Sequence, residues 1–176
     1  MITYNTINAA MPDIREAEVS AWVRQVAKGY GKVVGDVNYI FVDDETMLDI
    51  NRRFLGHDYY TDHIGFDYSE GDALSGDIYI SLDTVASNAR LFGTTPADEL
   101  RRIIIHGLLH LCGLRDKSPD EQALMRQAED KALREQGARG KEQENTMASK
   151  QSSCPQPLAP CPLPPAPCPL PLAPNN

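Results

Sequence analysis

The stretch from Ile103 to Lys117, which reads IIIHGLLHLCGLRDK, constrains the fold and the chemistry of this chain more than any other. Almost every residue of it before Gly113 is apolar, which predicts a buried helix. His106 and His110 are four residues apart, so a helix places them one above the other on the same face. Buried imidazoles need polar partners, because an unpaired polar group in a protein interior costs about 1–3 kcal/mol. A shared metal ion would satisfy both rings.

The residues after the histidine pair supply a third ligand. Gly113 suits the left-handed position that ends many helices, and Asp116 can then fold back beneath the pair. Two imidazoles and a carboxylate around an ion with one open position form the arrangement of catalytic zinc. We therefore predict that His106, His110 and Asp116 hold one Zn²⁺ ion per chain. Cys112 points off the ligand face, and we expect it to be a small core residue.

The spacing of the histidines also matches zinc peptidases, but the residue between them does not. The common peptidase motif is H-E-x-x-H, in which the Glu acts as the general base. In this chain Gly107 follows His106. A metallopeptidase is therefore the least favoured of three functional interpretations.

The segment from His106 to Gly113, HGLLHLCG, resembles the H-G-x-L-H-L-x-G signature of the YbeY family of bacterial endoribonucleases that mature ribosomal RNA. In that family a third His usually stands at the position of Asp116. The resemblance extends over about residues 1–137. It includes, in order, Ile50-Asn51 with Phe54, Thr61-Asp62 with Phe66, and Gly76-Asp77-Ile78. The chain departs from the family pattern at Leu55, where Arg is usual, and at Tyr60 and Asp67, where Pro is usual.

The resemblance implies a metal-dependent endoribonuclease specific for single strands, which acts at the 3′ end of 16S rRNA and in ribosome quality control. Its partners would be ribosomal RNA precursors and the small ribosomal subunit. Arg115 could steady phosphate charge, and Asp62, which with Asp77 would border the catalytic cleft, is a second catalytic candidate. Exposure at a turn and a strand-end hydrogen bond remain the structural alternatives for these residues. The motif supplies no obvious general base.

A second class of function uses the same ligands differently. A ribosome-assembly factor could bind its target through a domain in which the metal is only structural. Three protein ligands and an open position favour catalysis, because structural zinc sites are usually closed by four protein ligands.

The net charge of −8 is unfavourable for a nucleic-acid binder that relies on overall charge. RNA contacts would need a local basic surface, and we expect no DNA partner. The candidates are Arg52, Arg53, Arg90, Arg101, Arg102, Arg115 and Lys117. No apolar run of transmembrane length and no leader stand out, which predicts a cytoplasmic protein without a membrane partner.

We expect one α/β domain over residues 1–140, with a small mixed sheet packed by helices and the metal-binding helix at its centre. His57 and His63 are lone histidines, which we expect to lie outside the ligand set. The sequence predicts strands at about 1–5, 32–42, 61–68 and 77–82, and helices at about 13–28, from 43 onward, 82–91, 95–112 and 118–136.

The last residues, 141–176, differ in composition from the rest. Three repeats of seven residues begin at Cys154, Cys161 and Cys168, and each is rich in proline. Proline forbids a continuous helix, so we predict an extended, disordered tail that the domain does not need. The even spacing of its cysteines indicates repetition rather than a metal site or cross-links.

Overall fold

The computed structural model describes residues 1–144 of this chain. Within them a four-stranded sheet and its helices form an α/β fold, as the sequence predicts. In chain order the elements are β1 (Ile2–Ile7), α1 (Glu16–Gly29), β2 (Val33–Val42), α2 (Asp44–Ile50), the π-helical segment η1 (Asn51–Leu55), β3 (His63–Asp67), β4 (Ala73–Ser81), α3 (Leu82–Phe92), α4 (Pro96–Leu111) and α5 (Pro119–Glu144).

The sheet is mixed, with the strand order β1-β2-β4-β3. β1, β2 and β4 are parallel, and β3 pairs antiparallel with β4 at one edge. Strand β2 lies between two parallel partners, and the apolar residues of its second half are buried: Val37, Tyr39, Ile40, Phe41 and Val42. A strand that is buried on both faces needs a nearly continuous apolar run. This requirement explains why β2 is so apolar.

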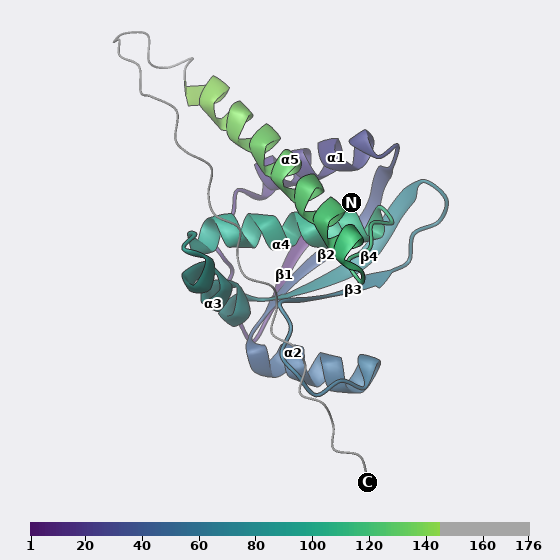
Figure 1. Cartoon of the computed structure of the whole chain (residues 1–176), viewed down its shortest axis with the longest axis vertical. Helices are drawn as coiled ribbons and strands as arrows, with labels where there is room; N and C mark the ends of the chain where they lie inside the picture. The colour runs from purple at the N-terminus through teal and green to yellow at the C-terminus, as the bar shows by residue number, and fades with distance from the viewer. Residues whose placement is uncertain (145–176) are drawn as a thin grey trace.

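Helices cover both faces of the sheet (Figure 1). Helices α1, α4 and α5 lie over one face, where their apolar side chains form the main core with β2 and β4. Helix α2 lies over the other face, where Met47 packs against Ile40 and Val42. Helix α4, which carries the histidine pair, therefore lies at the centre of the domain, and its Ile104, Ile105, Leu108 and Leu109 are completely buried.

Side-chain caps fix the starts of several helices. Asp43 accepts a hydrogen bond from the backbone N–H of Thr46 at 2.8 Å, so it caps α2, which begins where the sequence predicts a helix. Asp44 accepts a hydrogen bond from the Thr84 hydroxyl at 2.7 Å and so joins α2 to α3. Asp43 and Asp44 are therefore held by structural hydrogen bonds at this helix start.

Two predicted boundaries near the sheet were wrong. Helix α1 begins at Glu16 rather than Asp13, because a turn from Pro12 to Ile14 precedes it. Strand β4 begins at Ala73 rather than Asp77. The first residue of β4 pairs with Val33 of β2. The connection between β3 and β4 is therefore shorter than the predicted one, which lies between the strands at about 61–68 and 77–82.

The predicted end of the last helix was also wrong. Helix α5 continues past Gln136 and through Gly137 and Gly140 to Glu144. Each interior glycine costs only about 1 kcal/mol relative to alanine, and the intervening residues are good helix formers. The predicted tail from Cys154 onward lies outside the described residues. No helix within residues 1–144 combines the length and the apolar character needed to cross a membrane.

Candidate metal centre

Helix α4 is built to hold its histidines in a fixed place. Thr95 accepts a hydrogen bond from the backbone N–H of Asp98 at 3.1 Å, and Pro96 occupies the first helical position. The helix ends before Gly113, whose φ of 97° lies in the left-handed region. The end at Gly113 agrees with the sequence prediction, and the two caps leave His106 and His110 in the last turns.

The two histidines meet through their Nε2 atoms, which lie 3.0 Å apart. Each ring is held by its other nitrogen. Nδ1 of His106 lies 2.6 Å from a carboxylate oxygen of Glu129, and Nδ1 of His110 lies 2.9 Å from the backbone oxygen of Leu114. Histidines that bind metals are usually oriented in this way, with the non-ligating nitrogen bonded to a protein oxygen. Both Nε2 atoms are therefore presented to one point.

Asp116 folds back toward this point, as the sequence predicts. Its Oδ2 lies 3.5 Å from Nε2 of His110 and 3.7 Å from Nε2 of His106. Donor atoms about 2.0–2.2 Å from a tetrahedral ion would lie roughly 3.3–3.6 Å from one another. The three observed separations bracket this range, so the two imidazoles and the carboxylate fit a small divalent ion.

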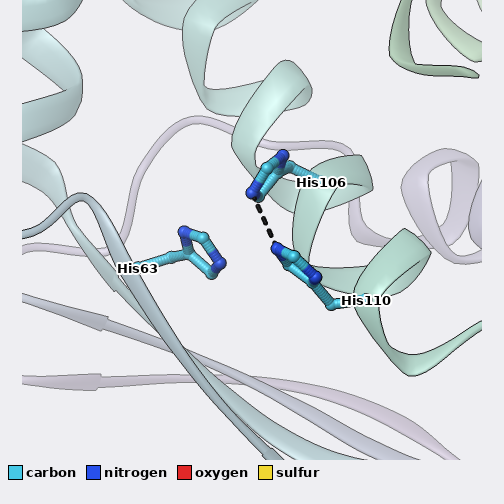
Figure 2. A group of neighbouring side chains, drawn as sticks. All are labelled: His63, His106 and His110. Carbon is cyan, nitrogen blue, oxygen red and sulfur yellow. Dashed lines mark hydrogen bonds between the residues drawn. The ribbon is translucent and has the colours of Figure 1, made fainter. Parts of the chain in front are cut away.

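His63 lies beside the histidine pair, although the sequence predicts a place for it outside the ligand set. Figure 2 shows its ring facing the space beside His106 and His110. The ring centroids lie 4.6 Å from His106 and 5.5 Å from His110. Potential ligand atoms of all three histidines lie within 4.8 Å of one another, so the cluster could hold a metal ion. His57, the other lone histidine, instead stacks on Tyr59 on the exposed loop after η1.

Sequence reasoning missed His63 because its position depends on strand pairing. Along β3 the side chains alternate, and His63 pairs with Ile80 of β4, whose side chain faces α4. His63 therefore points toward α4, whereas Ile64 packs on the opposite face with Met47. The alternation is visible in the sequence, but the face that meets α4 is not.

Glu129 of α5 is a second residue that sequence reasoning missed. It is buried, and its carboxylate contacts both His106 and Arg102, the latter at 2.9 Å. A signal exists in the sequence, because Glu129 shares a helix face with the apolar residues Met125 and Ala132. A lone acid in an apolar stripe indicates a buried partner.

The surroundings of His106 favour positive charge. Burial lowers the pKa of His106, but the hydrogen bond with Glu129 and the negative charges of Glu129, Asp62 and Asp116 outweigh it, so the pKa lies above its ordinary value. The pKa of His110 is lowered by burial and by the charges of the neighbouring histidines. Carboxylates that favour a proton on His106 would equally favour a bound cation.

Asp62, the predicted catalytic acid, lies beside the cluster. Its Oδ1 is 3.0 Å from Nδ1 of His63. Burial raises the pKa of Asp62, but the hydrogen bond with His63 and the charges of His63 and His106 outweigh this effect, and the pKa lies below its ordinary value. The carboxylate therefore orients the imidazole of His63. Asp77 is bound elsewhere, by Asn38 at 2.6 Å.

Arg115, the other catalytic candidate, is exposed in the loop between α4 and α5. Within residues 1–144 no hydrogen bond or ion pair joins it to the histidines. A cleft of about 240 Å³ opens beside the cluster between β3 and α4, and its lining includes His63, Gly65 and His110. A slightly larger hollow of about 260 Å³, lined partly by Asp49 and Phe54, belongs to α2 and η1 and not to the histidine cluster.

Gly107 explains why the site does not resemble that of a peptidase. It is buried against β4, and a Cβ atom at this position would lie 2.7 Å from Cγ2 of Ile78. A glutamate side chain would collide with the sheet instead of reaching the ion. Cys112, as expected, packs at the edge of the core, and burial raises the pKa of its thiol to about 11.

Comparisons with known proteins show the family of this chain. A family model described as Endoribonuclease YbeY matches residues 5–137. A protein of Bacteroides thetaiotaomicron named Endoribonuclease YbeY is 54% identical over 132 residues, which are 75% of this chain and 96% of that protein. One of the same name from Porphyromonas gingivalis is 52% identical over 132 residues, 75% of this chain and 87% of that protein.

A solved structure supports the fold as well. The solution structure of a Thermotoga maritima protein is similar with a TM-score of 0.58 and 27% sequence identity. The similarity covers 88% of this chain and all of that one (100%). Because the family model matches most of the chain and the relatives are more than half identical, this chain belongs to the YbeY family of endoribonucleases.

Proposed function

We propose that this chain is a metal-dependent endoribonuclease specific for single-stranded RNA, acting on ribosomal RNA precursors at the 3′ end of 16S rRNA and in ribosome quality control. Its relatives bear the name Endoribonuclease YbeY. The observation that carries the proposal is the approach of two Nε2 atoms to 3.0 Å with the carboxylate of Asp116 beside them. Work on the small ribosomal subunit implies a cytoplasmic location.

The proposed ligands are His106, His110 and Asp116, and the proposed ion is one Zn²⁺ per chain. When bound, the ion would polarise a phosphate oxygen and make a bound water more acidic. Glu129 and the Leu114 carbonyl hold the two imidazoles in place, so the ligands need little rearrangement. Asp62 and Arg115 remain the proposed catalytic residues. Arg115 directly precedes the proposed ligand Asp116, and we propose that it contacts phosphate on the substrate.

A local surface offers arginines and aromatic rings to RNA despite the unfavourable net charge, with Arg52 paired to Asp58 at 2.7 Å and Arg53 to Asp49 at 3.7 Å. Residues 52–60 are all exposed and carry two arginines and several large rings: Arg52, Arg53, Phe54, Tyr59 and Tyr60. Aromatic side chains stack on unpaired bases, and arginines contact the backbone phosphates. The segment leads directly into β3 and His63. We therefore propose that it receives single-stranded RNA and guides it to the metal centre.

One observation favours the alternative of a ribosome-assembly factor with a structural metal. His63 lies near enough to provide a fourth protein donor, and four protein ligands are typical of closed, structural zinc sites. The cleft beside His63 and His110 favours catalysis instead, because it gives a substrate access.

RNA cleavage by the wild type, compared with that of His110→Ala, distinguishes these two functions. For an endoribonuclease, His110→Ala abolishes cleavage of single-stranded RNA while binding to the small ribosomal subunit remains. Circular dichroism and thermal unfolding establish that the variant is folded. Wild-type protein that binds the subunit but leaves every RNA intact would instead support the assembly factor.

A further inference from the structure

The histidine from the sheet edge is arranged like the two histidines of α4. Nδ1 of His63 lies 3.0 Å from Asp62, just as Nδ1 of His106 and of His110 lie close to protein oxygens. In each ring Nδ1 is engaged by an oxygen, and in the α4 pair the two Nε2 atoms face each other at 3.0 Å. Figure 2 shows a nitrogen of His63 directed toward the space between the other two rings. Three independently anchored imidazoles thus converge from two elements, β3 and α4.

We propose that His63 is a protein ligand of the same metal ion, so that the centre of this chain is held by three histidines in addition to Asp116. The inference deepens the proposed function and rests on it for the role of the ion. It rests on geometry: the potential ligand atoms of the three histidines lie within 4.8 Å of one another, and an anchored second nitrogen is the usual companion of a metal-binding imidazole.

A core histidine without a metal is the competing explanation, and the packing argues against it. A neutral imidazole has one donor and one acceptor nitrogen, and both need partners when buried. Asp62 serves one nitrogen of His63, but the space before the other holds two further imidazoles, at 4.6 and 5.5 Å between centroids. A cation shared among the three rings satisfies all of them at once.

The inference assigns Asp116 a separate role. Its side chain is 40% exposed, whereas those of His63 and His106 are 15% exposed. With three histidines holding the ion from inside, Asp116 is the donor that water or substrate can displace. The fourth position is then open only when Asp116 has left the ion, which reconciles four protein donors with the open position that catalysis requires.

The test is the affinity of the protein for Zn²⁺, measured by competition with a chromophoric chelator. His63→Ala is expected to weaken Zn²⁺ binding by more than the roughly 10–100-fold typical of losing an outer-shell partner, and Asp62→Asn by about that smaller factor. His57→Ala is the matched control, because the exposed His57 ring stacks on Tyr59 away from the cluster. This variant is expected to bind Zn²⁺ as the wild type does. Binding that is unchanged in His63→Ala but lost in His110→Ala would overturn the inference.

A measurement on the unaltered chain removes any doubt about folding of the variant. Addition of Zn²⁺ is expected to shift the ¹⁵N resonance of the free ring nitrogen of His63 together with those of His106 and His110. Shifts in the α4 histidines alone would refute a role for His63 as ligand. Zinc binding that depends on His63 in a protein unable to cleave RNA would support this inference while refuting the proposed endoribonuclease.

Discussion

The carboxylate of Glu129 connects the metal centre to the outer surface of the domain. It contacts Nδ1 of His106 on one side and the guanidinium of Arg102 on the other, and Arg102 also reaches Asp130 at 3.3 Å. Glu129 is buried, while Arg102 is partly exposed. The ion pair of Glu129 with Arg102 is therefore shielded from solvent at its carboxylate, which faces His106, and open to solvent at its guanidinium. A buried group with two charged partners is difficult to replace.

Glu129→Gln keeps the size of the side chain and removes its charge. We expect Zn²⁺ affinity to fall roughly 10–100-fold, because the proposed ligand His106 loses its orienting carboxylate. The free energy of unfolding should fall by about 1–3 kcal/mol. Asp130→Asn is the control, because it touches the same arginine from the surface and should cost at most about 1 kcal/mol with no change in metal affinity. Equal effects of both substitutions on zinc binding would contradict the assigned role of Glu129.

Asn51 holds the loop that presents the proposed RNA-binding residues. It is buried, and its amide donates a hydrogen bond to the backbone oxygen of Tyr59 at 2.7 Å. Asn51→Ala leaves that carbonyl without its partner, so we expect a loss of about 1–3 kcal/mol in unfolding free energy and a higher KM for RNA. The exposed Asn5→Ala serves as the comparison in chemical denaturation and cleavage assays. An unchanged KM would separate this loop from substrate binding.

At the scale of single residues, local patterns predicted that His106 and His110 share a helix face and that Asp116 folds back toward them. Both features depend on residues within a few helical turns of one another. His63 and Glu129 could not be placed by the same reasoning. Each reaches the centre from another element, β3 or α5, and the pairing of those elements with α4 is a property of the tertiary fold.

The contact between α4 and β4 sets the distance of the histidine pair from the sheet. Gly107 lies between the two proposed ligands in sequence and faces Ile78 at close range. Elements near the site were well predicted where caps and periodicity are local, as in α4 and α2. The boundaries of α1, β4 and α5 were less accurate, because strand pairing and tolerated glycines decide them.

Gly107→Ala tests this contact. Alanine favours a helix over glycine by about 1 kcal/mol, but the added Cβ would lie 2.7 Å from Ile78, and overpacking a core costs about 1–3 kcal/mol. We expect a net loss in unfolding free energy and weaker Zn²⁺ binding as α4 moves outward. Gly29→Ala near the end of α1 is the matched control, because nothing lies within 4 Å of its added Cβ. Similar stabilisation by both substitutions would show that α4 does not pack this closely on β4.

For the whole molecule, the family match ends before the proline-rich repeats, and the described core is built from residues within 1–144. The family match ends at residue 137, and the Trp22 indole donates a hydrogen bond to the backbone oxygen of Ala132 in α5. The sheet order could not be read from the sequence, because it depends on which distant strands pair. The division between a domain and a dispensable tail remains a prediction.

A chain ending at Glu144 tests that division. We expect it to fold with an unchanged melting temperature and to bind as much zinc as the full chain, because the described core lies within residues 1–144. Differential scanning calorimetry and metal analysis of both chains provide the comparison. Loss of zinc or of cooperative unfolding in the shorter chain would show that the repeats belong to the functional protein.

The most direct test of a metal-dependent endoribonuclease is the rate of single-stranded RNA cleavage as a function of measured metal occupancy. The protein is stripped with a chelator and reloaded with Zn²⁺ in steps up to one ion per chain, with His110→Ala treated in parallel. We predict a rate that rises in proportion to occupancy, vanishes in the stripped protein and stays absent in His110→Ala. Cleavage by the stripped protein at the full rate would contradict the account.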